Sequence, residues 1–234
     1  LSSIECLIHM AAPCPPWLKR RWNTLIGPTH LFEVYAATEA GIVTGIWGDE
    51  WEEHPNSVGL PMPNYELKIL GVNEEELPPG DVGEIFIRRT DREFAFRYVG
   101  SPPAKQVGGF TSIGDLGWLD EDGYLFIADR RVDMIITGGA NVFPAEVEAA
   151  LTEHTQIADV AVIGLPDEEW GRRVHAVIQP VNFDDLPTIE ALDKHCRERL
   201  MAYKIPKTYE YLEELPRTSA GKLRRSALIT ERGG

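Results

Sequence analysis

The chain has 234 residues, a length that suits one large domain or two modest ones. It carries 23 Lys and Arg residues against 37 Asp and Glu residues, and the resulting net charge of −14 argues against a nucleic-acid-binding surface. Apolar residues make up 43% and charged residues 26% of the chain, as in ordinary globular proteins. No apolar run approaches the ~18–20 residues that a transmembrane helix needs.

The first residues, LSSIECLIHMAAP, contain no initial Met and already form a strand-like apolar run. We therefore expect the chain to begin inside a domain, without a secretory signal. The three cysteines, Cys6, Cys14 and Cys196, form no CxxC pair, and the six histidines are scattered. This usage favours a reducing, cytoplasmic compartment over a disulfide framework or a zinc site.

Short strands dominate the first half of the predicted structure. Residues 4–10 are expected to form a buried strand, residues 17–26 a helix after Pro15-Pro16, and residues 31–35 a second strand. Between residues 64 and 127, short alternating runs separated by Gly and Pro predict an antiparallel β subdomain, spanning about residues 60–129.

The pattern changes after Asp129 to alternating strands and helices. Strands are expected over 132–137, 158–163, 174–178 and 208–212, with a turn at Gly138-Gly139. One helix begins at Pro144, and another places Ile189, Leu192, Cys196 and Leu200 on one face. The fold class is therefore α/β (α+β), with a domain boundary near residues 129–132.

Two segments in the first half carry candidate binding residues. The run Tyr35-Ala36-Ala37-Thr38-Glu39 combines an aromatic ring, small residues, a hydroxyl and a carboxylate, which suit a planar base, a phosphate and Mg²⁺. The alternative is a strand end followed by the first turn of a helix. Asp115, preceded by Gly114, offers two acceptor oxygens for the two hydroxyls of a ribose. The alternative there is an ordinary Gly-Asp turn.

Two segments in the second half are also candidates. The guanidinium of Arg130 can donate paired hydrogen bonds to ribose or phosphate oxygens, and Gly138-Gly139 permits close approach of a ligand to the backbone. The alternative is a charged linker followed by a hairpin turn. Lys222 is a cation on a loop of small residues, and Leu223 excludes a P-loop because that motif needs Ser or Thr there. The alternative is the solvated basic start of a C-terminal helix.

In their order and spacing, the four segments resemble the adenylate-forming superfamily of acyl-CoA synthetases, peptide-synthetase adenylation domains and luciferases. The motifs that carry the resemblance are YAATEA, SIGDLG, DRRVDMIITGG and TSAGKLRR. Bacterial fatty-acyl-CoA or related acid–CoA ligases are most similar, on the stretches GDLGWLDEDGYLFIADR, ANVFPAEVEAAL and GLPDEEWGRRVHAVI.

The resemblance implies two domains and an incomplete enzyme. Residues 1–129 would be the C-terminal part of a large AMP-binding domain, and residues 130–234 a mobile C-terminal lid domain. The family's phosphate loop lies upstream of the Tyr35 motif, so we expect the activity to belong to the full-length protein and this chain alone to be inactive. Three positions depart from the family pattern, which are Ala36 for Gly, Ile113 for Thr and Val132 for a charged hinge residue.

The resemblance also implies a role for each candidate residue. Tyr35 would pack on adenine, Asp115 and Arg130 would hold the ribose, and Lys222 would bridge the substrate carboxylate and the α-phosphate. Thr38 would contact phosphate and Glu39 would bind Mg²⁺, so both count with Lys222 as catalytic. Further residues implied near the nucleotide or the acyl group are Ala11, Ala12, Pro13, Ala36 and Ala37. Gly138 and Gly139 would line the channel for the coenzyme A thiol.

The implied reaction has two halves and uses small molecules only. A carboxylic acid, fatty or related and hydrophobic, reacts with Mg·ATP to give acyl-AMP and pyrophosphate, and CoA then displaces AMP. Two alternatives stay open on the sequence alone. One is a non-catalytic nucleotide- or partner-binding module, and the other is an adenylation domain that loads a carrier protein instead of CoA.

Overall fold

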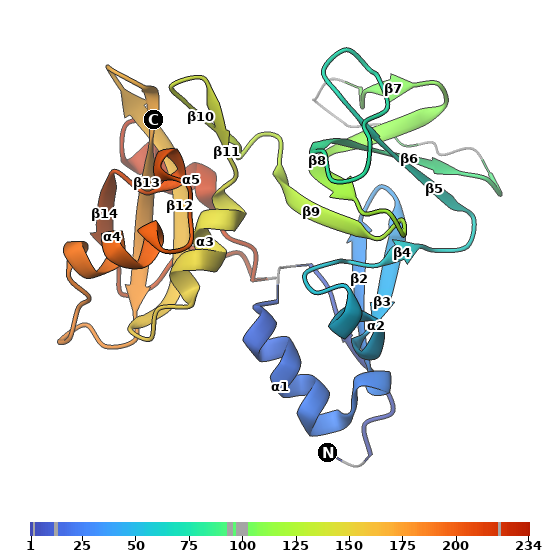
Figure 1. Ribbon diagram of the computed structural model, residues 1–234, viewed down its shortest axis with the longest axis horizontal. Helices are drawn as coiled ribbons and strands as arrows, with labels where there is room; N and C mark the ends of the chain where they lie inside the picture. The colour runs from blue at the N-terminus through green and yellow to red at the C-terminus, as the bar shows by residue number, and fades with distance from the viewer. Residues whose placement is uncertain (2, 12–13, 93–95, 97–102, 220) are drawn as a thin grey trace. The chain divides into compact units, whose positions relative to one another are not determined.

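A computed structural model describes residues 1, 3–11, 14–92, 96, 103–219 and 221–234. The chain divides into two compact units, Leu1–Arg131 and Val132–Gly234. Each unit combines helices with its own sheets (Figure 1), so the expected α/β (α+β) class is confirmed. Among the described residues, no helix has the length and apolarity to cross a bilayer.

The first unit is built on two sheets. The smaller has the strand order β1-β2-β3-β4, formed by Leu7–His9, Leu31–Ala37, Gly41–Trp47 and Leu60–Pro61. The larger has the order β5-β6-β8-β7, with β9 also paired to β8; these strands are Tyr65–Leu70, Gly83–Arg89, Phe110–Leu119, Gln106–Val107 and Leu125–Arg130. All pairs except β1–β2 are antiparallel. The strands expected between residues 64 and 127 are therefore present.

One hydrophobic cluster joins the two sheets. It combines Val43 of β3 with residues of the larger sheet, including Ile85 of β6 and Leu125 of β9, all fully buried. Tyr35 of β2 packs against the same cluster. Because interiors are close-packed, this shared core holds β2 in a defined position against the larger sheet.

The N-terminal strand and helix differ from the expectation. β1 is only three residues long and its side chains are partly exposed, because it lies at the sheet edge and pairs with β2 alone. The expected buried strand over 4–10 is therefore wrong in length and burial. The helices among the described residues of the first unit are α1 (Pro16–Ile26), α2 (Gly48–Glu53) and the short 3-10 helix η1 (Pro28–His30).

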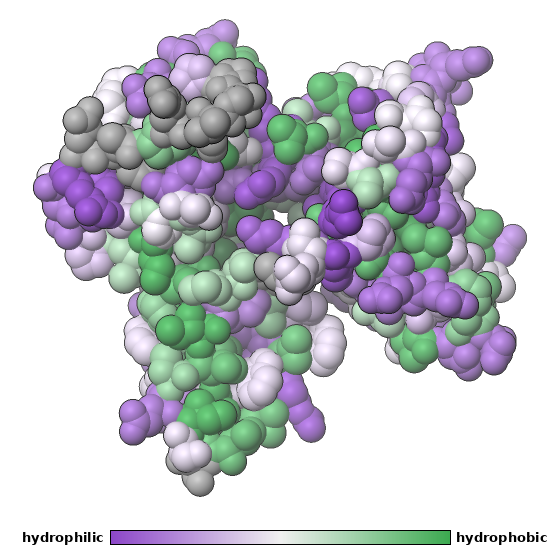
Figure 2. All heavy atoms as spheres, turned by 180° about the vertical axis from the view of Figure 1, so that it is seen from behind, coloured by the Kyte–Doolittle hydropathy of each residue, from purple (hydrophilic) through white to green (hydrophobic). Residues whose placement is uncertain are grey.

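Helix α1 buries polar side chains and exposes apolar ones. Lys19 forms an ion pair with Glu33, and Asn23 donates to the Gly48 carbonyl at 3.0 Å. Trp17 is 61% exposed. Figure 2 shows apolar side chains gathered over the part of the surface that β1 and α1 form. The apolar spacing predicted this helix but not the face that it buries.

The second unit is a three-stranded sheet covered on both faces. Its order is β12-β13-β14, formed by Ile157–Asp167, Gly171–Pro180 and Thr208–Tyr211, with β13 antiparallel to β12 and parallel to β14. The other elements are the hairpin β10–β11 (Ile135–Thr137 and Ala140–Val142), helices α3 (Pro144–Thr152), α4 (Ile189–Arg197) and α5 (Arg225–Glu231), and the 3-10 helix η2 (Ala202–Lys204).

Alternate residues of β12 pack into two different clusters. Val160 and Val162 join side chains of α3, α4 and the β10–β11 hairpin. Ala161 and Ile163 join Leu228 of α5 on the opposite face. A strand that is buried on both faces shows a continuous apolar run instead of alternation. This explains the sequence around Ala161.

We expect Leu192→Ala to destabilise the second unit by about 2–5 kcal/mol, because Leu192 is fully buried among α3, α4 and β12 and its truncation leaves a cavity. Ile189→Ala, on the same helix at a 54% exposed position, is the matched control and should cost less than about 1 kcal/mol. Urea denaturation followed by circular dichroism measures both. Equal losses would contradict the packing described for α4.

Candidate functional site

Three of the candidate residues meet in the first unit. The Tyr35 hydroxyl donates a hydrogen bond to Oδ2 of Asp115 at 2.5 Å, although the two residues are 80 positions apart. Nε of Arg130 lies 3.3 Å from the other carboxylate oxygen, Oδ1. Asp115 and Arg130 face each other directly as register partners of β8 and β9. The structure therefore assembles an aromatic ring, a carboxylate and a guanidinium at one place.

A wide bulge in β8 sets the position of Asp115. Between the register pairs Glu84–Leu116 and Phe86–Ser112, one residue of β6 faces three residues of β8, 113–115. Gly114 has φ +85°, a conformation that few other residues adopt readily, and its N–H donates to Oγ of Ser112 at 3.0 Å. The alternative of an ordinary Gly-Asp turn is wrong, since Asp115 lies within a strand.

The surroundings of Asp115 explain how its charge is held. Only 6% of the residue is exposed, and a buried carboxylate needs partners that replace water. The Tyr35 hydroxyl and the exposed Arg130 guanidinium supply them. Burial raises the pKa of Tyr35 far above its ordinary value, and the neighbouring Asp115 charge adds to the effect, so the phenol stays protonated as a donor.

Thr38 and Glu39 follow Tyr35 in a tight turn. β2 ends at Ala37, residues 38–40 form the turn, and β3 begins at Gly41. The alternative of a helix after the strand is therefore wrong. The side chains of Thr38 and Glu39 make no hydrogen bond or ion pair with any other described residue, and the Glu39 charge contributes to the raised pKa of Tyr35. Both side chains remain available to a ligand beside the Tyr35 ring.

The remaining candidate residues of the first unit contribute no polar side chain to the site. Ala36 is exposed and follows a register shift in the β2–β3 pair, while Ala37 ends β2. Ala11 is exposed with φ +75°, unusual for a residue other than Gly. Ala12 and Pro13 lie outside the described residues.

Gly138 and Gly139 form the turn of the β10–β11 hairpin in the second unit. Their φ angles of +55° and +83° match the two-residue turn that suits twisted strands. A Cβ on Gly138 would lie 2.6 Å from the Trp170 ring, whereas a Cβ on Gly139 would meet no atom within 4 Å. The Gly138 N–H also donates to the Trp170 carbonyl at 2.9 Å. The predicted turn is present, and Trp170, which sequence reasoning passed over, packs on its first glycine.

Lys222 lies in a turn whose backbone is closely held. The Thr218 N–H donates to the Lys222 carbonyl at 2.8 Å, and the Lys222 N–H donates to Oγ1 of Thr218 at 3.2 Å. Arg217 donates to the Gly221 carbonyl at 2.7 Å and to Asp159 of β12 at 3.1 Å. Helix α5 begins at Arg225, the last residue of the TSAGKLRR run, so the run does lead into a C-terminal helix, but Lys222 itself lies three residues before that helix.

The side chain of Lys222 contrasts with its backbone. It is exposed and makes no hydrogen bond or ion pair with any other residue in the described part of the chain. Three positions later, Arg225 pairs with Glu148 of α3 at 2.6 Å and with Asp133 at 3.6 Å. Arg217 and Arg225 thus hold this segment through partners that are distant in sequence. No local sequence pattern identifies either partner.

Family models match both units. The model described as "AMP-binding enzyme" matches residues 1–91, and that described as "AMP-binding enzyme C-terminal domain" matches residues 146–222. The long-chain-fatty-acid–CoA ligase of Bacillus subtilis (strain 168) is 37% identical over 238 residues, which cover 99% of this chain. The ligase of the same name from Salmonella typhimurium is 33% identical over 97% of this chain. In both cases the chain spans 41% of the relative's length.

Solved structures show the same architecture. The o-succinylbenzoate CoA synthetase MenE from Bacillus subtilis, in complex with its acyl-adenylate intermediate, gives a TM-score of 0.85 at 31% identity and covers 97% of this chain and 46% of its own. ATP-bound MatB from Rhodopseudomonas palustris gives 0.86 at 28% identity, with coverage of 97% and 45%. With two family models matching in order and with relatives aligned along nearly its whole length, the chain belongs to the AMP-binding, adenylate-forming enzyme family.

Proposed function

We propose that this chain forms part of an acid–CoA ligase that converts a carboxylic acid to an acyl-adenylate and then to an acyl-CoA. The observation that carries the proposal is the cluster of Tyr35, Asp115 and Arg130, assembled from two sheets around one buried carboxylate. Relatives named as long-chain-fatty-acid–CoA ligases support a fatty or related hydrophobic acid as substrate.

Asp115 is the proposed anchor for the ribose of ATP. The Tyr35 hydroxyl and Nε of Arg130 place its two carboxylate oxygens, and a carboxylate with two acceptor oxygens matches the two hydroxyls of a ribose. Arg130 can also turn toward the ribose, because its side chain is 64% exposed. The small residues Ala36 and Ala37 leave room for the base next to the Tyr35 ring.

Glu39 fits the requirements of a Mg²⁺ ligand. Mg²⁺ is usually held by one or two carboxylates together with phosphate oxygens, and Glu39 offers a carboxylate that no other described residue occupies. When bound there, Mg²⁺ would neutralise phosphate charge. Thr38, adjacent on the same turn, would donate its hydroxyl to a phosphate oxygen.

Lys222 is the proposed catalytic cation of the first half-reaction. The substrate carboxylate attacks the α-phosphorus of ATP, pyrophosphate leaves, and negative charge develops on the oxygens between the two reactants. A cation that the protein supplies at that charge lowers the barrier. The backbone of the turn around Lys222 is anchored, and no other described residue pairs with the ammonium, so the side chain is available for this role.

The second half-reaction needs a path for a thiol and no lysine. The thiol sulfur attacks the acyl carbonyl and AMP leaves, so a domain that exchanges Lys222 for a thiol channel serves both halves. We assign residues 1–129 to the nucleotide-binding domain and residues 130–234 to this mobile lid, and Gly138 and Gly139 to the wall of the channel. Coenzyme A is the proposed acceptor, and the three free cysteines fit a cytoplasmic location.

Lys222→Ala in the full-length protein should lower the rate of adenylate formation by at least about 100-fold, because no cation then stabilises the negative charge that develops on the phosphate. Thioester formation from supplied acyl-adenylate should stay within about threefold of wild type. ATP–pyrophosphate exchange and release of AMP measure the two halves separately. Lys194→Ala, an exposed lysine of α4, is the matched control. Equal loss of both halves would remove Lys222 from its proposed role.

Asp115→Ala should raise the KM for ATP by about 10-fold or more, since hydrogen bonds to a charged group contribute about 1.5–3 kcal/mol each. Tyr35→Phe keeps the ring and removes only the donor, so a smaller rise is expected. Initial rates at varied ATP concentration give both values, and Asp81→Ala at an exposed position is the control. An unchanged KM in the folded Asp115→Ala variant would contradict the ribose assignment.

Gly139→Ala should slow the thioester half-reaction and spare adenylation, because the added Cβ points into open space where the thiol is proposed to pass; its φ of +83° also costs about 1–2 kcal/mol of stability. Gly138→Ala should lower the stability further, since its Cβ also collides with Trp170. Stopped-flow measurement of each half-reaction, with a thermal melt for each variant, distinguishes the two effects. If Gly139→Ala leaves both half-reactions unchanged, the channel does not pass this turn.

A further inference from the structure

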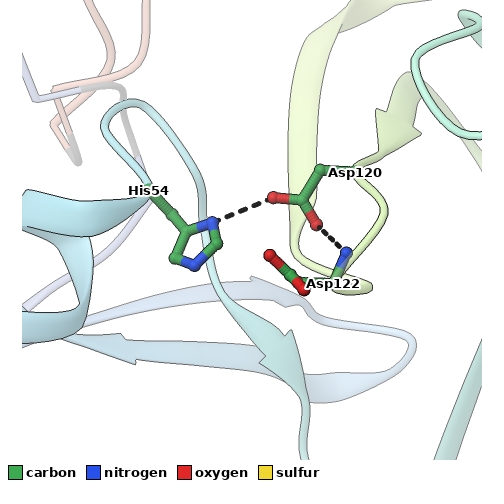
Figure 3. Close-up of side chains that lie close together, drawn as sticks. All are labelled: His54, Asp120 and Asp122. Carbon is green, nitrogen blue, oxygen red and sulfur yellow. Dashed lines mark hydrogen bonds and ion pairs between the residues drawn. The ribbon is translucent and has the colours of Figure 1, made fainter.

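A second group of ligand-type side chains lies in the first unit, apart from the Asp115 cluster. His54 directly follows α2, and Asp120 and Asp122 lie in the turn between β8 and β9. One ligand atom from each residue lies within 4.8 Å of the others. Figure 3 shows the imidazole and the two carboxylates facing one another from these two segments, which are 66 positions apart.

Two of the three side chains, those of His54 and Asp120, are held in place before any ligand arrives. Oδ1 of Asp120 accepts hydrogen bonds from the backbone N–H groups of Tyr124 and Asp122, at 2.8 and 3.1 Å. The His54 ring stacks on Tyr124 with ring centroids 3.7 Å apart. Asp120 and His54 are mostly buried, at 22% and 17% side-chain exposure. A preorganised donor set loses little conformational entropy when it binds a ligand.

The charge around the group is negative and uncompensated. Four carboxylates lie near Tyr124, whose ring stacks on His54; they are Glu50, Asp120, Glu53 and Asp122. Within the described part of the chain, no Lys or Arg forms an ion pair with any of these four carboxylates, and only His54 pairs with one of them. A cation that bound here would therefore be attracted by several charges at once.

The spacing suits a metal ion between the imidazole and the carboxylates. Nδ1 of His54 lies 2.9 Å from Oδ2 of Asp120. Ligand atoms bonded to Zn²⁺ at about 2.0–2.2 Å in tetrahedral geometry lie about 3.3–3.5 Å apart, so an opening of about half an ångström would admit the ion. The neutral ring would then carry its proton on Nε2 and present the Nδ1 lone pair.

We propose that His54, Asp120 and Asp122 form a binding site for a divalent first-row transition metal, with Zn²⁺ as the representative ion. The nitrogen ligand disfavours Mg²⁺, which prefers oxygen ligands, and one nitrogen with two carboxylate oxygens is a set that Zn²⁺ accepts, with water filling the open position. The ion clips the end of α2 to the β8–β9 turn. The site takes no part in the proposed ligase reaction, so either proposal can fail without the other.

The test is a titration of the chelator-stripped chain with Zn²⁺, by isothermal calorimetry in a non-coordinating buffer without nucleotide. We expect one site of highest affinity, which excess Mg²⁺ does not displace. His54→Gln and Asp122→Asn should each weaken it by at least about 10-fold, as even changes in residues that only support metal ligands do. His30→Gln and Asp81→Asn are the matched controls in the same unit and should bind as wild type.

Asp122→Asn keeps the test sound if His54→Gln disturbs the fold, because the Asp122 side chain is exposed and makes no hydrogen bond or ion pair with another described residue. Zn²⁺ should also raise the melting temperature of the wild-type chain but not of these two variants. Unchanged Zn²⁺ affinity in both variants would overturn the proposal. Equal competition by Mg²⁺ would also overturn it, leaving a hydrogen-bonded His–Asp pair on an acidic surface.

Discussion

The buried carboxylate of Asp115 is the group on which the candidate nucleotide site depends. A carboxylate that has lost most of its water is stable only with donors fixed around it, and here these are the Tyr35 hydroxyl and the Arg130 guanidinium. The donors come from different sheets, so the packing between the sheets and the pairing of β8 with β9 must both be correct. The same interactions that stabilise the charge also form the site before a ligand arrives.

In the second unit, a rigid sheet supports the turn that contains Lys222. Its sheet is covered on both faces, and the fully buried Val162 and Ile163 pack into opposite clusters. Onto this base Arg217 fastens the turn of Lys222 through Asp159, and Arg225 fastens the following helix through Glu148. Ion pairs at a surface contribute little to stability, so their main effect here is on the geometry of the turn.

Much of the fold is predictable from periodicity, but the geometry of the site is not. The strands between residues 64 and 127 and helix α4 follow visible apolar spacing, and α3 follows the proline that begins it. For Asp115 the sequence leaves open an ordinary Gly-Asp turn, because that pair is common in turns, whereas a bulge that depends on the partner strand β6 places it within β8. Similarly, the partners His54 and Asp120 are 66 positions apart, and no local sequence pattern predicts a contact over that separation.

The two glycines of the β10–β11 turn are explained by different constraints. A two-residue turn of this type needs a positive φ at both positions, and its usual sequences place Gly second, after Asn, Asp or Gly. At Gly138 the Trp170 ring lies where a Cβ would stand, so packing adds to the demand of the backbone. At Gly139 a Cβ would meet no atom within 4 Å, but φ is +83°, so the turn itself favours glycine there. The case for a thiol channel beside this hairpin therefore depends on the open space next to Gly139 and not on the glycine itself, as the case for catalysis depends on the Lys222 ammonium, which no other described residue pairs.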